Sequence, residues 1–320
     1  MKKYLIIILI LTASGSVIGQ SEIDLKNPPA EAALLADGFI STPMNERDFA
    51  FSPDGTEIYY TISTPQSTFQ TIVVSRKNKS GKWSKPEVVS FAGKFSDLEP
   101  ALSADGKKLY FASNRPIEGN KPKDFDIWMV ERNGNTWGEP QNAGKVVNTE
   151  SDEFYPSITK SGNLYFTAQY KDGVGREDIF LALWKNGQYE KPVALDTAIN
   201  SKGFEFNAFV DPDETFILFT GYGRKDDLGR GDLYMSLKDA SGKWLTAKNL
   251  TLLNSNRLDY CPYVSPDKKI LFFTSERAPL PVSFDAKATY DQIQKVNQST
   301  LNGSGNIYWV SFEKILGFIR

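Results

Sequence analysis

The stretch DLEPALSADGKKLYFASNR at residues 97–115, followed by a polar loop and DIW at 126–128, decides the fold. An Asp-Gly pair between two apolar runs is a strong signal for a β-hairpin. The stretch therefore predicts a short strand, a tight turn at residues 104–106, a second strand, a loop and a third strand.

The same pattern occurs five times along the chain. The matching turns begin at Ser52, Ser103, Thr159, Asp211 and Ser265. Neighbouring turns lie 51 to 56 residues apart, and an apolar or aromatic strand follows each of them. Four short strands repeated at a period near 50 residues indicate a β-propeller with one four-stranded blade per repeat.

These repeats, over about residues 48–312, resemble the WD-like repeat of TolB-type propellers. The resemblance implies an all-β propeller and a single domain over residues 20–320. The resemblance says little about function, because proteins of one fold differ in function according to their individual sites.

The N-terminal region supplies a strand that the last repeat lacks. Residues 29–35 look like the fourth strand of a repeat, while the chain ends soon after the third strand of the fifth repeat. We therefore predict five blades, closed by an N-terminal strand in the C-terminal blade, which protects sheet edges. Six blades is the alternative if residues 20–47 pair differently.

Residues 1–19 have the features of a secretory signal peptide. Lys2 and Lys3 precede an apolar run over residues 4–11, which is too short to span a membrane. The sequence thus predicts an exported protein, periplasmic or extracellular, without a membrane span. The formal charge of −2 disfavours a general role in binding nucleic acid.

The fifth repeat carries an insertion at residues 276–305, between its second and third strands. Apolar residues at positions 290, 293 and 296 suggest a short amphipathic helix within residues 286–297.

An acid stands six residues before each turn, and a cation follows in four repeats. The acids are Glu46, Asp97, Glu153, Glu205 and Asp259, and the cations are Arg115, Lys171, Arg224 and Arg277. Propeller topology places both sets toward one mouth of the channel. Because they recur in every repeat, we interpret them mainly as structural ion pairs and turn contacts. If the protein is an enzyme, the candidate catalytic residues are Asp97, Glu153, Glu205 and Asp259, since two carboxylates can act as acid and base or nucleophile.

Residues that break the repeat are the candidate ligand-binding set, because aromatic side chains beside cations suit recognition of sugars or peptides. This set is Tyr155, Tyr170, Arg176, Tyr222, Arg224, Tyr260 and Arg277.

The chain contains no His, which excludes Ser-His-Asp triads and His-based metal sites. We expect no metal and no cofactor. The preferred hypothesis is a monomeric, non-catalytic binding or scaffold protein of the cell envelope that recognises a protein segment or a glycan at one mouth of the propeller. The alternative is a carboxylate-dependent glycoside hydrolase or another glycan-active enzyme.

Overall fold

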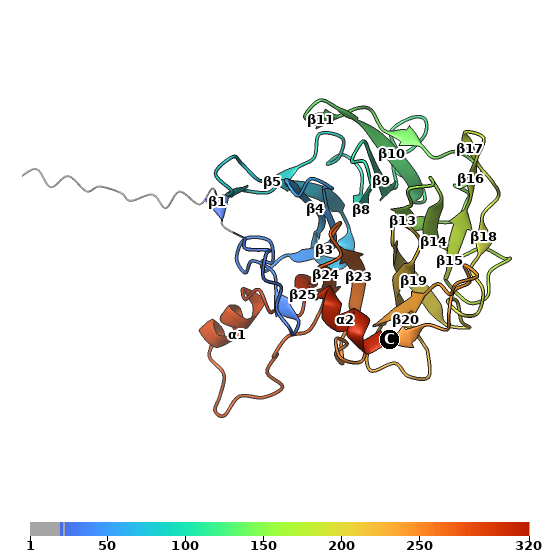
Figure 1. Cartoon of the computed structure of the whole chain (residues 1–320). Coiled ribbons are helices and arrows are strands. Elements are labelled where there is room, and N and C mark those ends of the chain that lie inside the picture. Colours follow the sequence, from blue (N-terminus) through green and yellow to red (C-terminus); the bar gives the residue numbers. More distant parts are fainter. Residues whose placement is uncertain (1–19, 22, 320) are drawn as a thin grey trace, which may run out of the picture.

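The computed structural model describes residues 20–21 and 23–319, and these residues form five antiparallel blades around a central axis (Figure 1). The innermost strands of the blades are β3 (Asn45–Phe51), β8 (Asp97–Leu102), β13 (Glu153–Ile158), β19 (Phe204–Val210) and β23 (Asp259–Val264). The second strands are β4 (Glu57–Ser63), β9 (Lys108–Ser113), β14 (Leu164–Ala168), β20 (Phe216–Tyr222) and β24 (Ile270–Ser275). The third strands are β5 (Gln70–Arg76), β10 (Asp126–Asn133), β15 (Asp178–Ala182), β21 (Asp232–Leu237) and β25 (Asn306–Ser311). The predicted all-β propeller is confirmed, with five blades rather than six.

The outer edge of each blade is short. The fourth strands are β7 (Glu87–Val88), β12 (Gln141–Asn142), β18 (Val193–Ala194), β22 (Lys248–Asn249) and β2 (Ala33–Leu34). Further small elements are β1 (Gln20–Ser21) paired with β6 (Trp83–Ser84), β11 (Thr136–Trp137) on β10, the hairpin of β16 (Trp184–Lys185) and β17 (Gln188–Tyr189), and the 3-10 turn η1 (Pro65–Ser67). Two-residue edge strands offer little template for pairing with another chain.

The tight turn of the repeat forms because its Ser and Asp side chains bond to the local backbone. In the second blade Ser103 Oγ donates to Asp105 Oδ1 at 2.7 Å and accepts from the Lys108 N–H at 3.0 Å. Gly106 completes the turn at φ +69°, a conformation that side chains disfavour. We call the end of the propeller that carries these five turns the turn face.

The core lies between the blades. Tyr59 and Ile72 of blade 1, for example, pack in one cluster with Leu109 and Phe111 of blade 2. Corresponding clusters join each of the four remaining pairs of neighbouring blades, including blades 5 and 1. The alternation of side chains along each strand therefore buries both faces of every blade.

An N-terminal strand closes the ring, as predicted. β2 pairs antiparallel with β25, with Ala33 opposite Trp309 and Leu34 opposite Tyr308. Leu35 and Ile40 are buried in the cluster shared by blades 5 and 1. The first and last segments of the propeller are thereby held in one sheet.

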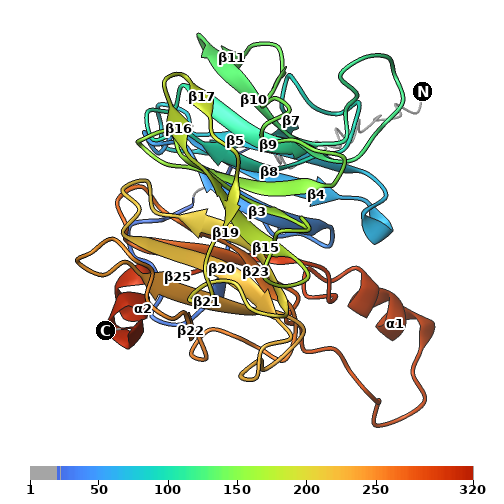
Figure 2. The same cartoon turned by 90° about the vertical axis from the view of Figure 1, so that its right-hand side faces the viewer.

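Two helices lie at opposite ends of the propeller (Figure 2). α1 (Tyr290–Asn297) sits in the loop between β24 and β25, starts with a capping box at Thr289 and buries none of its side chains. α2 (Phe312–Ile319) buries Phe312, Ile315 and Ile319 against blades 4 and 5. Among the described residues, no helix is long and apolar enough to cross a membrane. The expected signal peptide at residues 1–19 lies outside the described residues.

Candidate functional site

Three of the repeated acids are clamped by an arginine of the same blade. Asp97 pairs with Arg115 at 2.6 Å, Glu205 with Arg224 at 2.8 Å, and Asp259 with Arg277 at 2.6 Å. These carboxylates are fully buried. Each arginine also donates to a backbone carbonyl of the incoming loop, at Phe91, Ile199 and Leu253. The pairs therefore fasten each blade to the segment that leads into it.

The other two acids, Glu46 and Glu153, have no arginine partner in the described part of the chain. Glu153 accepts from Thr149 Oγ1 at 2.7 Å and from Tyr170 Oη at 2.6 Å. Glu46 accepts from the Thr42 backbone N–H at 3.1 Å. Lys171, the cation expected beside Glu153, is exposed, and the preceding Tyr170 takes its place. Burial raises the pKa of both glutamates to about 7, although these hydrogen bonds oppose the shift.

These raised pKa values predict that the protein loses stability between about pH 4.5 and pH 7. A carboxyl with a raised folded-state pKa keeps its proton where the unfolded chain has lost it, so its contribution is full below pH 4.5 and vanishes above pH 7. We expect the free energy of unfolding to fall by roughly 3 kcal/mol per group, because each pKa moves from 4.5 to about 7 and one unit corresponds to about 1.4 kcal/mol. The chain has no His to mask the effect. Urea unfolding from pH 4.5 to pH 8 measures it.

The variant Glu153→Gln should flatten this pH profile, and the exposed Glu118→Gln should leave it unchanged. A profile that rises toward pH 8 in the natural protein would contradict the buried, protonated state of these glutamates.

The predicted ligand-binding residues do not form one site. Tyr155 and Tyr260 are buried near the axis, while Arg176 and Tyr222 are exposed at the end opposite the turn face. Arg176 and Tyr222 both lie beside Phe204. The Arg176 guanidinium is 5.5 Å from the centre of the Phe204 ring, and the centre of the Tyr222 ring is 5.9 Å from it. Tyr170, Arg224 and Arg277 are occupied by the repeated acids described above.

A polar ring, which we call the axial ring, lies on the axis at the position two residues after each repeated acid. Its members are Asp48, Glu99, Tyr155, Asn207 and Cys261, and all five have positive φ between 49° and 61°. Each innermost strand shifts its register at this point, as expected for a β-bulge. The bulge turns all five side chains toward one another, which the repeat pattern alone did not predict.

Arg47 organises this ring. Its guanidinium donates to Asp48 Oδ1 at 2.8 Å and to Glu99 Oε1 at 2.9 Å, and it lies 5.3 Å from the Tyr260 ring centre. The Cys261 thiol donates to Asp48 Oδ1 at 2.8 Å. Burial raises the pKa of Cys261 well above its usual range, so the thiol is not activated.

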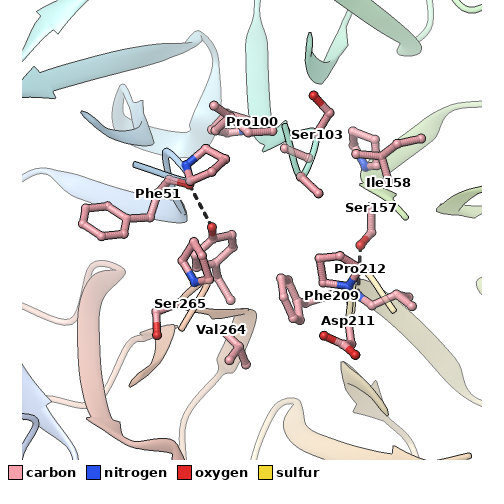
Figure 3. Close-up of a pocket in the computed structure, with 18 of the residues that line it drawn as sticks. Phe51, Pro100, Ser103, Ser157, Ile158, Phe209, Asp211, Pro212, Val264 and Ser265 are labelled. Atoms are coloured by element: carbon pink, nitrogen blue, oxygen red, sulfur yellow. Dashed lines mark hydrogen bonds between the residues drawn. The ribbon is translucent and has the colours of Figure 1, made fainter. Parts of the chain in front are cut away.

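A pocket of about 180 Å³ opens above this ring, on the turn face. Glu99 and Tyr155 contribute to its floor, and its walls are mainly apolar. Figure 3 shows the side chains that surround this opening, among them Pro100, Ile158, Phe209 and Val264. We call this cavity the axial pocket. It lies at the mouth opposite to the one where the sequence analysis placed the repeated acids and cations, and residues from all five innermost strands line it.

Several polar atoms in the walls of the axial pocket already have partners. Tyr263 Oη donates to the Phe51 carbonyl at 2.9 Å, and Ser157 Oγ accepts from the Val210 N–H at 2.9 Å (Figure 3). At the rim, Lys160 pairs with Asp213 at 2.8 Å. Such an apolar cavity with paired polar groups suits an apolar side chain.

The described residues contain no group of three or more His, Cys, Asp or Glu side chains arranged to hold a metal ion.

No protein-family model matches the chain, and no curated protein matches it. Solved structures share its fold. A glycoside hydrolase aligns over 89% of this chain and 92% of its own, at 8% identity and a TM-score of 0.55. The endo-arabinase from Bacteroides thetaiotaomicron VPI-5482 aligns over 85% and 96%, at 13% identity and a TM-score of 0.50.

A putative TolB from Agrobacterium tumefaciens aligns over 84% of this chain and 91% of its own, at 16% identity and a TM-score of 0.49. The chain is a five-bladed propeller. That architecture, expected from the TolB-type repeats, is confirmed by the blades themselves. Likeness at these identities concerns the fold alone.

Proposed function

We propose that this chain is a non-catalytic binding propeller of the cell envelope, which takes an apolar anchor side chain of a protein segment into the axial pocket. The observation that carries the proposal is an apolar cavity formed where the five innermost strands converge. Its volume of about 180 Å³ is below the roughly 300–1,000 Å³ of small-molecule pockets. One or two side chains of a partner suit this space.

The state of the carboxylates supports a binding role over hydrolysis. A glycosidase uses two carboxyl groups roughly 5 to 9 Å apart that flank an open substrate site. Here Asp97, Glu205 and Asp259 are buried against arginines, and Glu153 is buried against Tyr170. The two carboxylates that meet on the axis, those of Asp48 and Glu99, are bridged by Arg47.

The walls of the axial pocket favour a protein segment over a glycan. A sugar brings many hydroxyl groups, and each one buried without a hydrogen bond costs free energy. The aromatic, proline and aliphatic walls would leave most of them unpaired. An apolar side chain gains from the same walls, at roughly 25 cal/mol for each Å² removed from water.

The location of this binding protein follows from residues 1–19. Their charged start and short apolar run support export, and we therefore place the partner in the periplasm or outside the cell.

The experiment is a selection of random decapeptides on the purified protein, beside a panel of plant, algal and peptidoglycan-derived glycans read by thermal shift and reducing-end release. We expect enrichment of peptides with a shared apolar position and no release of reducing ends. Release that disappears in Glu153→Gln would instead establish a hydrolase, and a glycan thermal shift without release would replace the protein partner by a sugar.

The variant Phe209→Ala should weaken binding of a selected peptide about 10- to 30-fold, because truncating a central aromatic contact costs about 2 kcal/mol. Phe209 is half-buried and lines the axial pocket. Isothermal titration measures the change. Phe91→Ala is the matched control, since Phe91 is also half-buried but packs against Phe111, away from the pocket. Equal losses in the two variants would contradict this assignment of the pocket.

A further inference from the structure

The axial pocket continues outward between two blades. A second cavity, of about 530 Å³, shares Ser103, Ala104, Ile158 and Lys160 with it. This second cavity lies between blades 2 and 3 and extends to the β16–β17 hairpin, which Figure 1 places at the outer edge of the ring. We call it the radial groove.

The outer end of the radial groove has an aromatic wall. Trp184 is 41% exposed, and its ring lies 4.7 Å from that of Tyr189 in an edge-on arrangement. The indole also lies close to Gly162, where a Cβ atom would be only 2.9 Å from Trp184 Cδ1. The indole is thus held in place while part of its surface faces solvent. A fixed aromatic side chain provides contact area at low entropic cost.

The charges along the radial groove favour an acidic occupant. Its lining has four cations, at Lys107, Lys108, Arg132 and Lys160, against two carboxylates, at Asp105 and Glu131. Glu57 and Asp213, which lie outside the lining, compensate Arg132 and Lys160, so the positive charge that a partner can meet is that of Lys107 and Lys108. Complementary charge of this kind attracts and orients a partner.

Two of these cations remain available to a partner. Arg132 is committed to Glu57 at 2.6 Å, and Lys160 is committed to Asp213. The ammonium groups of Lys107 and Lys108 approach their nearest carboxylates, Asp105 and Glu131, only to 3.8 and 3.6 Å. Within the described residues these distances exceed hydrogen-bonding range, so both lysines keep donors for an incoming carboxylate.

We propose that the axial pocket and the radial groove form one binding channel for an extended acidic protein segment, with its apolar anchor on the axis and its Asp or Glu side chains over Lys107 and Lys108. This inference rests on the proposed function and names the class of partner. Strands within a blade are about 4.8 Å apart and an extended chain rises about 3.3 Å per residue. About three to five residues beyond the anchor therefore span the groove.

The test is the decapeptide selection repeated in parallel on three proteins. These are the natural chain, the groove variant Lys107→Glu/Lys108→Glu, and the control variant Lys79→Glu/Lys82→Glu, whose exposed lysines lie on the outside of blade 1. On the natural chain and the control, we expect Asp or Glu to be enriched within five residues of the apolar position. On the groove variant, we expect Lys or Arg there instead.

A peptide selected on the natural chain should bind the groove variant at least tenfold more weakly at low salt, and 0.5 M NaCl should reduce this difference because salt screens exposed charges. An apolar position enriched without an acidic preference, or with the same preference on the groove variant, overturns the channel and leaves the proposed function standing. No enrichment on any of the three proteins overturns both.

Discussion

Replacement of Arg47 by Met is expected to lower the free energy of unfolding by about 3–5 kcal/mol, because it leaves buried carboxylates without their cation. Arg47 bonds both Asp48 and Glu99, whose side chains are 1% and 3% exposed. Burial already raises the pKa of Glu99, and Arg47 opposes that shift. Urea unfolding at pH 7 measures the loss.

The deficit of Arg47→Met should grow as pH rises above 8. The pKa of Glu99 is about 8 in the natural protein, and loss of the guanidinium raises it further, so the natural protein and the variant lose stability in parallel below pH 8 and only the variant continues to lose it above. The control is Arg176→Met, the same change at an exposed arginine, for which we expect less than about 0.5 kcal/mol. A loss in Arg47→Met no larger than in this control would contradict the central role of Arg47 in the axial ring.

Truncation of Leu35 to Ala is expected to cost about 2–5 kcal/mol, because it opens a cavity where the ring closes. Leu35 is 1% exposed, directly follows β2, and packs in the cluster that joins blades 5 and 1. Its backbone N–H donates to the Ile307 carbonyl at 2.9 Å. Chemical denaturation gives the loss, and hydrogen exchange should show faster opening of β25 than of β15.

Leu228→Ala is the matched control, since Leu228 is 50% exposed in a loop of blade 4. We expect a change within about 0.5 kcal/mol there. Uniform acceleration of exchange in β15 and β25 would show that closure is not the local weak point of the ring.

Much of the fold could be predicted because its determinants are local. The Ser-Ala-Asp-Gly turn at residues 103–106 bonds to its own backbone, and the strand beside it alternates side chains toward two neighbouring blades. Repetition of that unit leaves few other architectures. The closure by β2 was also predicted, since the last repeat lacked a fourth strand and residues 29–35 resembled one, and the pairing of β2 with β25 confirms it.

The candidate site could be predicted only in part. The repeated acids and their arginines were recognised, and the pairing of Asp97 with Arg115 follows directly from their shared offset. For Glu153 the repeat offset indicated Lys171, whereas the structure has the preceding residue, Tyr170, as the partner. The spacing of residues alone does not show which of two neighbouring side chains points inward at the end of a strand.

The sequence by itself determined the blade and its repetition, because hydrogen bonds and alternation within about 50 residues specify them. The choice of five blades over six depended on the long-range pairing of β2 with β25. Only the tertiary structure revealed the axial ring and the pocket above it. The axial ring takes one residue from each blade, including Asp48 and Cys261, which are far apart in the chain and meet at 2.8 Å. The pocket above it exists because five bulged strands converge, and such convergence has no counterpart in local sequence.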